Sequence, residues 1–84
     1  KLNLDFLIIT IERQHNPQKK DLLIRFLFLL LDNAKIAVSS FGGRKLVDLM
    51  EQLDSRSQKK LANHPNLSII LSPLEIEDLK RKIV

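Results

Sequence analysis

Residues 22–31 of this chain read LLIRFLFLLL, an apolar run that only Arg25 interrupts. A surface helix keeps a polar face, so a helix that is apolar nearly all round is buried on more than one side. In a small domain, this segment is therefore either the central helix or one half of a protein interface. The run is about half of the roughly 20 residues that cross a membrane and it carries a charge, so no membrane span is expected.

The ends of this helix are marked by residues with clear positional preferences. Asn16 is a good N-cap and Pro17 is tolerated at the first helical position, which predicts a helix from about Pro17 to Leu31. Asp32 and Asn33 form its expected exit.

The N-terminal segment has two readings. Asn3 as an N-cap, followed by apolar residues at helical spacing, predicts a helix with one face formed by Leu4, Leu7, Ile8 and Ile11. Alternating apolar residues and a β-branched stretch instead favour a strand over the same region. Both alternatives stay open from sequence.

The middle of the chain is expected to form an amphipathic helix. After a short apolar segment from Ile36 to Phe41, Gly42-Gly43 is predicted to break the chain, and a helix should run from about Arg44 to Asp54. Its apolar face would hold Leu46, Leu49, Met50 and Leu53, and the opposite face Arg44, Asp48, Glu51 and Ser55.

The C-terminal third is predicted to contain two further helices. Ser57 is expected to cap a short helix that His64-Pro65 ends. Residues 67–71 fit either a strand or a helix. Ser72-Pro73-Leu74-Glu75 has the form of a capping box and predicts a final amphipathic helix.

Together these segments predict a mainly α protein, a small bundle or repeat-like array of about four to five short helices, with a short strand at either end. The 84 residues, 44% hydrophobic and 29% charged, fit one folded domain over residues 1–84. Because the first residue is Lys, the domain is expected to be excised from a longer chain.

No pattern of residues points to catalysis. The chain lacks a P-loop, a dinucleotide fingerprint, a G-x-S-x-G elbow and an H-E-x-x-H motif. It has no Cys and only His15 and His64, so neither a metal site nor a cofactor is expected. The sequence therefore predicts a protein that is not an enzyme.

A net charge of +4 permits binding to nucleic acid. Two basic clusters are the candidates for such a site: Arg56, Lys59 and Lys60, and Lys80, Arg81 and Lys82. No aromatic residue interleaves with either cluster, so a solvated basic face is the favoured reading. A small nucleic-acid-binding domain is kept as the alternative function. For either function, the protein is expected to be intracellular, in the cytoplasm or the nucleus.

The stretch Asn16 to Asp54 resembles one armadillo or HEAT-like helical repeat, through the helix NPQKKDLLIRFLFLLLDN and the following GGRKLVDLMEQLDS. That family binds partner proteins along a groove lined by third helices. The resemblance implies that Arg44, Asp48, Glu51 and Ser55 face such a groove. No second full unit follows Asp54, although a repeat array generally needs about three units.

The leading expectation is a non-enzymatic helical protein interaction module, acting as an adaptor, assembly or regulatory domain. Its contact would be the second helix, with Phe26 and Phe28 as anchors for a protein partner or for a homodimer. An apolar surplus in the absence of any catalytic motif supports this expectation.

Overall fold

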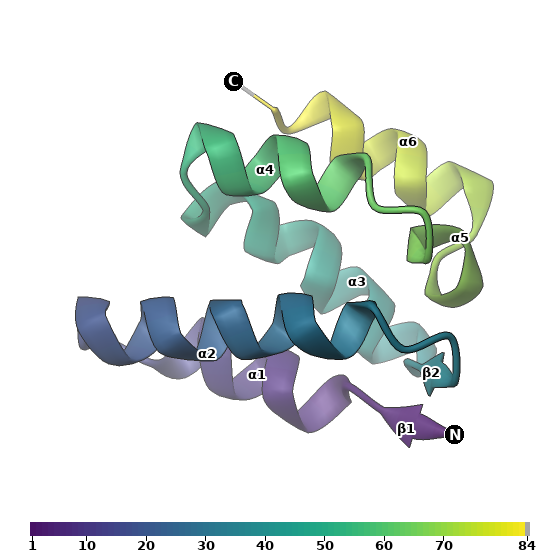
Figure 1. Cartoon of the computed structure of the whole chain (residues 1–84). Coiled ribbons are helices and arrows are strands. Elements are labelled where there is room, and N and C mark those ends of the chain that lie inside the picture. Colours follow the sequence, from purple (N-terminus) through teal and green to yellow (C-terminus); the bar gives the residue numbers. More distant parts are fainter. Residues whose placement is uncertain (84) are drawn as a thin grey trace.

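A computed structural model describes residues 1–83, which form six α-helices, one 3-10 helix and two short strands (Figure 1). The elements in chain order are β1 (Leu2–Asn3), α1 (Asp5–Arg13), α2 (Pro17–Leu31), β2 (Ile36–Ala37), α3 (Ser40–Leu49), η1 (Met50–Gln52), α4 (Ser55–Ala62), α5 (Leu67–Ile70) and α6 (Pro73–Arg81). The mainly α class is confirmed. The helices exceed the expected number because residues 67–70, which fitted either state, form the short helix α5.

Both readings of the N-terminal segment are partly correct. Leu2 and Asn3 form a strand that pairs in parallel with Ile36 and Ala37 of β2, and the helix α1 follows directly. The predicted N-cap at Asn3 is wrong, because Leu4 occupies that position; the Asn3 side chain instead accepts a hydrogen bond from the backbone N–H of Asp5 at 2.8 Å, as an Asx-type turn into the helix. The second strand lies in the middle of the chain rather than at its C-terminal end.

The predicted limits of α2 are confirmed. The Asn16 side chain accepts hydrogen bonds from the backbone N–H groups of Gln18 and Lys19, at 3.0 and 3.1 Å, and Pro17 is the first helical residue. The helix ends at Leu31, as expected from Asp32-Asn33.

The predicted break at Gly42-Gly43 is wrong, because both glycines lie inside α3. Ser39 caps this helix and its hydroxyl accepts a hydrogen bond from the N–H of Gly42 at 3.1 Å. A methyl group on Gly42 would overlap the Asp5 carboxylate, and one on Gly43 would lie 3.2 Å from Leu71 Cδ2. The glycines therefore permit close packing of the helix rather than a turn.

The later boundaries show one further correction. The helix expected to end near Asp54 stops at Leu49, and η1 continues its last turn. The cap of α4 is Asp54 and not Ser57, since Asp54 Oδ1 accepts a hydrogen bond from the N–H of Ser57 at 2.8 Å. The capping box of α6 is confirmed, with Ser72 and Glu75 bonding each other's backbone N–H groups.

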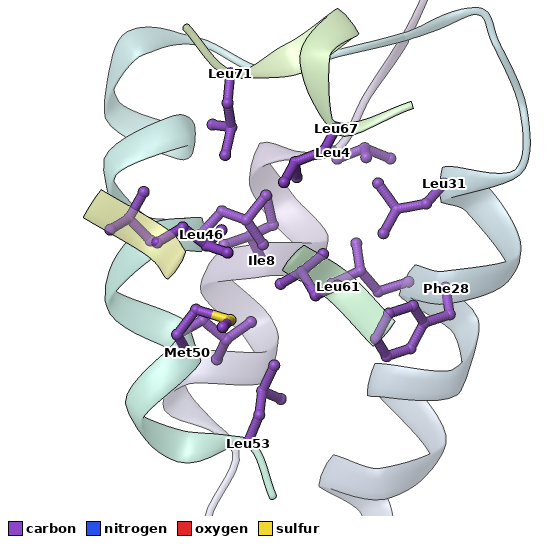
Figure 2. Packing of buried hydrophobic residues seen from close by; sticks show 14 of the residues in the cluster. Leu4, Ile8, Phe28, Leu31, Leu46, Met50, Leu53, Leu61, Leu67 and Leu71 are labelled. Atoms are coloured by element: carbon purple, nitrogen blue, oxygen red, sulfur yellow. The ribbon is translucent and has the colours of Figure 1, made fainter. Parts of the chain in front are cut away.

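One cluster of buried apolar residues joins the helices (Figure 2). The α3 helix lies between the α1–α2 pair and the α4–α6 pair, and it contacts both α1 and α6 (Figure 1). The predicted apolar face of α3 and η1 is confirmed, since Leu46, Leu49, Met50 and Leu53 are all buried. The central helix is thus α3, and α2 lies at the edge of the molecule.

Candidate interaction surface

Three apolar side chains lie exposed along one face of α2. Leu22, Phe26 and Leu29 keep 62%, 50% and 68% of their surface exposed, and their spacing of four and three residues places them in one line. We call these three residues the α2 stripe. The opposite face packs into the core through Ile24, Leu27, Phe28 and Leu31.

The exposure of the α2 stripe follows from the position of the helix. The sequence makes α2 apolar nearly all round, but its main helical neighbour is α1, so one side is left without cover. Burial of a Leu or Phe side chain is worth about 1.5–3 kcal/mol, and soluble proteins seldom leave several such side chains aligned in water without a use for them. The stripe is therefore the first candidate contact surface.

A cleft of about 920 Å³ lies along the other flank of α2, between this helix and the segment of η1 and α4. We call it the α2–α4 cleft. Its lining consists of Asp21, Ile24, Arg25, Phe28, Leu29 and Asp32 from α2 and its cap, and Gln52, Leu53, Asp54, Arg56, Ser57 and Lys60 from the facing segment. The buried side chains Ile24, Phe28 and Leu53 form its floor, and exposed charged side chains form its rim.

Polar contacts at both ends of α2 join it to η1 and to the turn that follows α4, and two of their residues, Gln52 and Asp32, line the cleft. The Lys20 ammonium donates to Gln52 Oε1 near the start of α2. Beyond the end of α2, His64 Nε2 lies 3.0 Å from Asp32 Oδ1, and the Asn66 amide donates to the carbonyl of Leu31 at 2.7 Å. His64 Nδ1 accepts the backbone N–H of Asn66, so the Nε2 proton is the one donated to Asp32.

Two of the three carboxylates on the rim, Asp32 and Asp54, accept hydrogen bonds from within the chain, whereas its two arginines form no ion pair with any described residue. Asp32 pairs with His64. Hydrogen bonds from the backbone and the hydroxyl of Ser57 hold the pKa of Asp54 below its ordinary value of 3.8. Within residues 1–83, no ion pair involves Arg25 or Arg56. Arg56 also contributes to the lowered pKa of Asp54, so Arg25 is the rim cation with the least interaction inside the described part of the chain, and it lies beside an apolar floor.

The residues expected on a groove face lie on three successive elements. Arg44 and Asp48 belong to α3, Glu51 to η1 and Ser55 to the start of α4, and all four are exposed. Glu51 accepts a hydrogen bond from the Lys82 ammonium at 2.9 Å, which raises the pKa of Lys82. Of the two expected anchors, Phe26 is exposed, whereas Phe28 is only 7% exposed and belongs to the core.

The six basic residues of the alternative site lie on α4 and at the end of α6. Three of them have contacts within the chain: Lys60 lies over the Phe28 ring at 4.5 Å, Arg81 pairs with Glu77 and Asp78, and Lys82 pairs with Glu51. Arg56, Lys59 and Lys80 are exposed. Three of the six basic side chains are thus already engaged in interactions within the chain.

The sequence gives no direct sign of the α2–α4 cleft. Arg25 interrupts an apolar run, and Leu53 belongs to the apolar face predicted for residues 44–54. A charged residue within such a run is a signal that one flank of the helix meets water, but only the fold shows that α4 faces that flank.

The described residues contain no group of three or more His, Asp or Glu side chains placed to hold a metal ion. Over the same residues, no helix has the length and apolarity needed to cross a bilayer. A scan against models of protein families, a search of curated proteins and a search of solved structures each found no match to the chain. The helix arrangement adds no support for an armadillo or HEAT repeat, because the glycine pair expected in the turn lies within α3.

Proposed function

We propose that this chain is a non-enzymatic protein interaction module that docks a partner protein, or a second copy of itself, through the α2 stripe. The single observation that carries the proposal is the exposure of Leu22, Phe26 and Leu29 in one line on an edge helix. Aligned apolar side chains at this spacing are the usual anchors when helices pack against a partner.

The contrast between Phe26 and Phe28 supports an external role for one face of α2. The two rings are two residues apart, yet Phe28 fills the core and Phe26 faces water. A helix that served only its own core would keep a polar residue at the exposed position. An adaptor, assembly or regulatory role fits this surface better than nucleic-acid binding, because the exposed aromatic side chains belong to α1, α2 and α3 and not to the helices α4 and α6 that carry the basic clusters.

Sedimentation velocity over a range of concentrations tests the proposal, together with affinity capture on the immobilised chain. Phe26→Asp should abolish self-association or capture of the partner while the circular dichroism spectrum stays helical. Phe41→Asp is the matched control, because this ring is also half exposed but lies on α3.

The proposal requires an association that Phe26→Asp removes and Phe41→Asp leaves in place. A chain that stays monomeric at every concentration, and that captures the same proteins with and without Phe26→Asp, would contradict it.

A further inference from the structure

We infer that the α2–α4 cleft is a second binding site, which takes a short peptide segment of another protein that carries apolar side chains beside acidic ones. The inference rests on residues that are largely separate from the α2 stripe, since Leu29 belongs to both surfaces but Leu22 and Phe26 lie outside the lining of the cleft. Three properties of the cleft support it: its apolar floor, the cations around it and the fixed position of α2.

The floor suits a small number of apolar side chains. The cleft volume of about 920 Å³ falls within the roughly 300–1,000 Å³ of ligand sites, which combine apolar walls with a few polar groups. Ile24, Phe28 and Leu53 each expose a small part of their side chains here. The flexible Lys60 side chain covers the Phe28 ring, and a carboxylate that draws its ammonium away would uncover the ring for an apolar side chain.

The charges around the cleft favour an acidic ligand. Arg25, Arg56 and Lys60 surround it, and within residues 1–83 none of the three forms an ion pair with a carboxylate. Three carboxylates line the cleft as well: Asp32 is held by His64, Asp54 caps α4 and is influenced by Arg56, and Asp21 is exposed on the rim. An incoming carboxylate would thus meet guanidinium groups that offer bidentate hydrogen bonds without first breaking an existing pair.

Contacts at both ends of α2 fix its position before any ligand arrives. Lys20–Gln52 joins α2 to η1, and His64–Asp32 and Asn66–Leu31 join its end to the turn that follows α4. A site fixed in this way loses little conformational entropy on binding, which favours affinity for a short segment.

A peptide fits this cleft better than a nucleic acid does. Binding of single strands depends on exposed aromatic faces for stacking, whereas the Phe28 ring keeps only 7% of its surface exposed. Asp21, Asp32 and Asp54 also line the cleft and would repel a continuous phosphate backbone. Separate carboxylates placed near Arg25 and Arg56 avoid that repulsion.

The test is a titration of the isotope-labelled chain, followed by NMR amide shifts, with short synthetic peptides. One peptide alternates Leu with Glu, a second replaces every Glu by Lys, and a third replaces every Leu by Ser. We expect only the first to bind, with shifts concentrated at Ile24, Phe28, Leu53 and Ser57. Arg25→Glu and Arg56→Glu should each lower the affinity for this peptide about tenfold or more, which corresponds to about 1.4 kcal/mol of binding free energy.

Lys59→Glu is the matched control, because it makes the same change of charge on α4 outside the cleft lining. It should leave the affinity within about twofold, and the amide spectra verify that each variant is folded. Phe26→Asp should also leave peptide binding intact, which separates this site from the α2 stripe.

The inference is overturned if the first peptide does not shift the cleft amides, or if the Lys peptide binds as well as the Glu peptide. The inference is also overturned if Lys59→Glu and Arg56→Glu weaken peptide binding equally, because the peptide would then respond to the net charge of the chain and not to the cleft. A single-stranded oligonucleotide that shifts the same amides, where the peptides do not, would assign the cleft to nucleic acid instead.

Discussion

Gly42 shows how one residue without a side chain sets the distance between two helices. The Asp5 carboxylate occupies the space that a Cβ atom at position 42 would need, and it accepts a hydrogen bond from the N–H of Ser39 at 2.9 Å. This single contact joins the start of α1 to the cap of α3. A residue that usually weakens a helix is therefore required here by packing.

We expect Gly42→Ala to destabilise the protein by about 1–2 kcal/mol, although Ala favours a helix by about 1 kcal/mol over Gly. The added methyl group must displace Asp5 and break its bond to Ser39. Chemical denaturation gives the free energy of unfolding of the two single variants and of the Asp5→Ala, Gly42→Ala double variant. In the Asp5→Ala background the same change should be neutral or stabilising, and an equal loss in both backgrounds would contradict the packing argument.

At the scale of the element, α4 depends on a charged cap at its first turn. Asp54 accepts the N–H of Ser57, and because hydrogen bonds favour the ionised carboxylate, the pKa of Asp54 in the folded protein lies below 3.8. A carboxylate with a lowered pKa contributes stability at pH values above its unfolded pKa of about 3.9. That contribution is lost as the pH falls through the folded pKa.

We therefore expect Asp54→Asn to lose less thermal stability than the parent chain when the pH is lowered below about 4. An Asn side chain caps a helix without titrating, so near neutral pH the two proteins should differ little. Thermal unfolding followed by circular dichroism at a series of pH values checks this. Asp21→Asn is the control. If it reduces the loss of thermal stability at low pH as much as Asp54→Asn does, the cap is not the cause of the effect.

At the scale of the whole molecule, one core buries side chains from both halves of the chain. Leu46 of α3 is fully buried, in the same cluster as Ile8 of α1 and Leu61 of α4 (Figure 2). Removing it would leave a cavity between segments far apart in sequence. The helices should therefore unfold together and not one by one.

We expect Leu46→Ala to destabilise the chain by about 2–5 kcal/mol, from lost burial and from the cavity. The matched control is Leu74→Ala, because Leu74 is 74% exposed and its truncation should stay within about 0.5 kcal/mol. Denaturant unfolding measured by circular dichroism gives both values. Similar losses for the two variants would show that the core is not centred on α3.

Local signals in the sequence determined the helical class, the caps at Asn16 and Ser72 and the inward face of residues 46–53, because capping bonds and helical periodicity depend on residues a few positions apart. Only the tertiary structure decided what depends on distant neighbours. It paired Leu2 with Ile36, placed Gly42 against Asp5 inside a helix, and buried Phe28 while leaving Phe26 exposed. An apolar run looks the same on every side until the fold covers one of them. The α2 stripe and the α2–α4 cleft therefore depend on the position of α2 at the edge of the molecule, where it packs against α1 and faces η1 and α4 across the cleft.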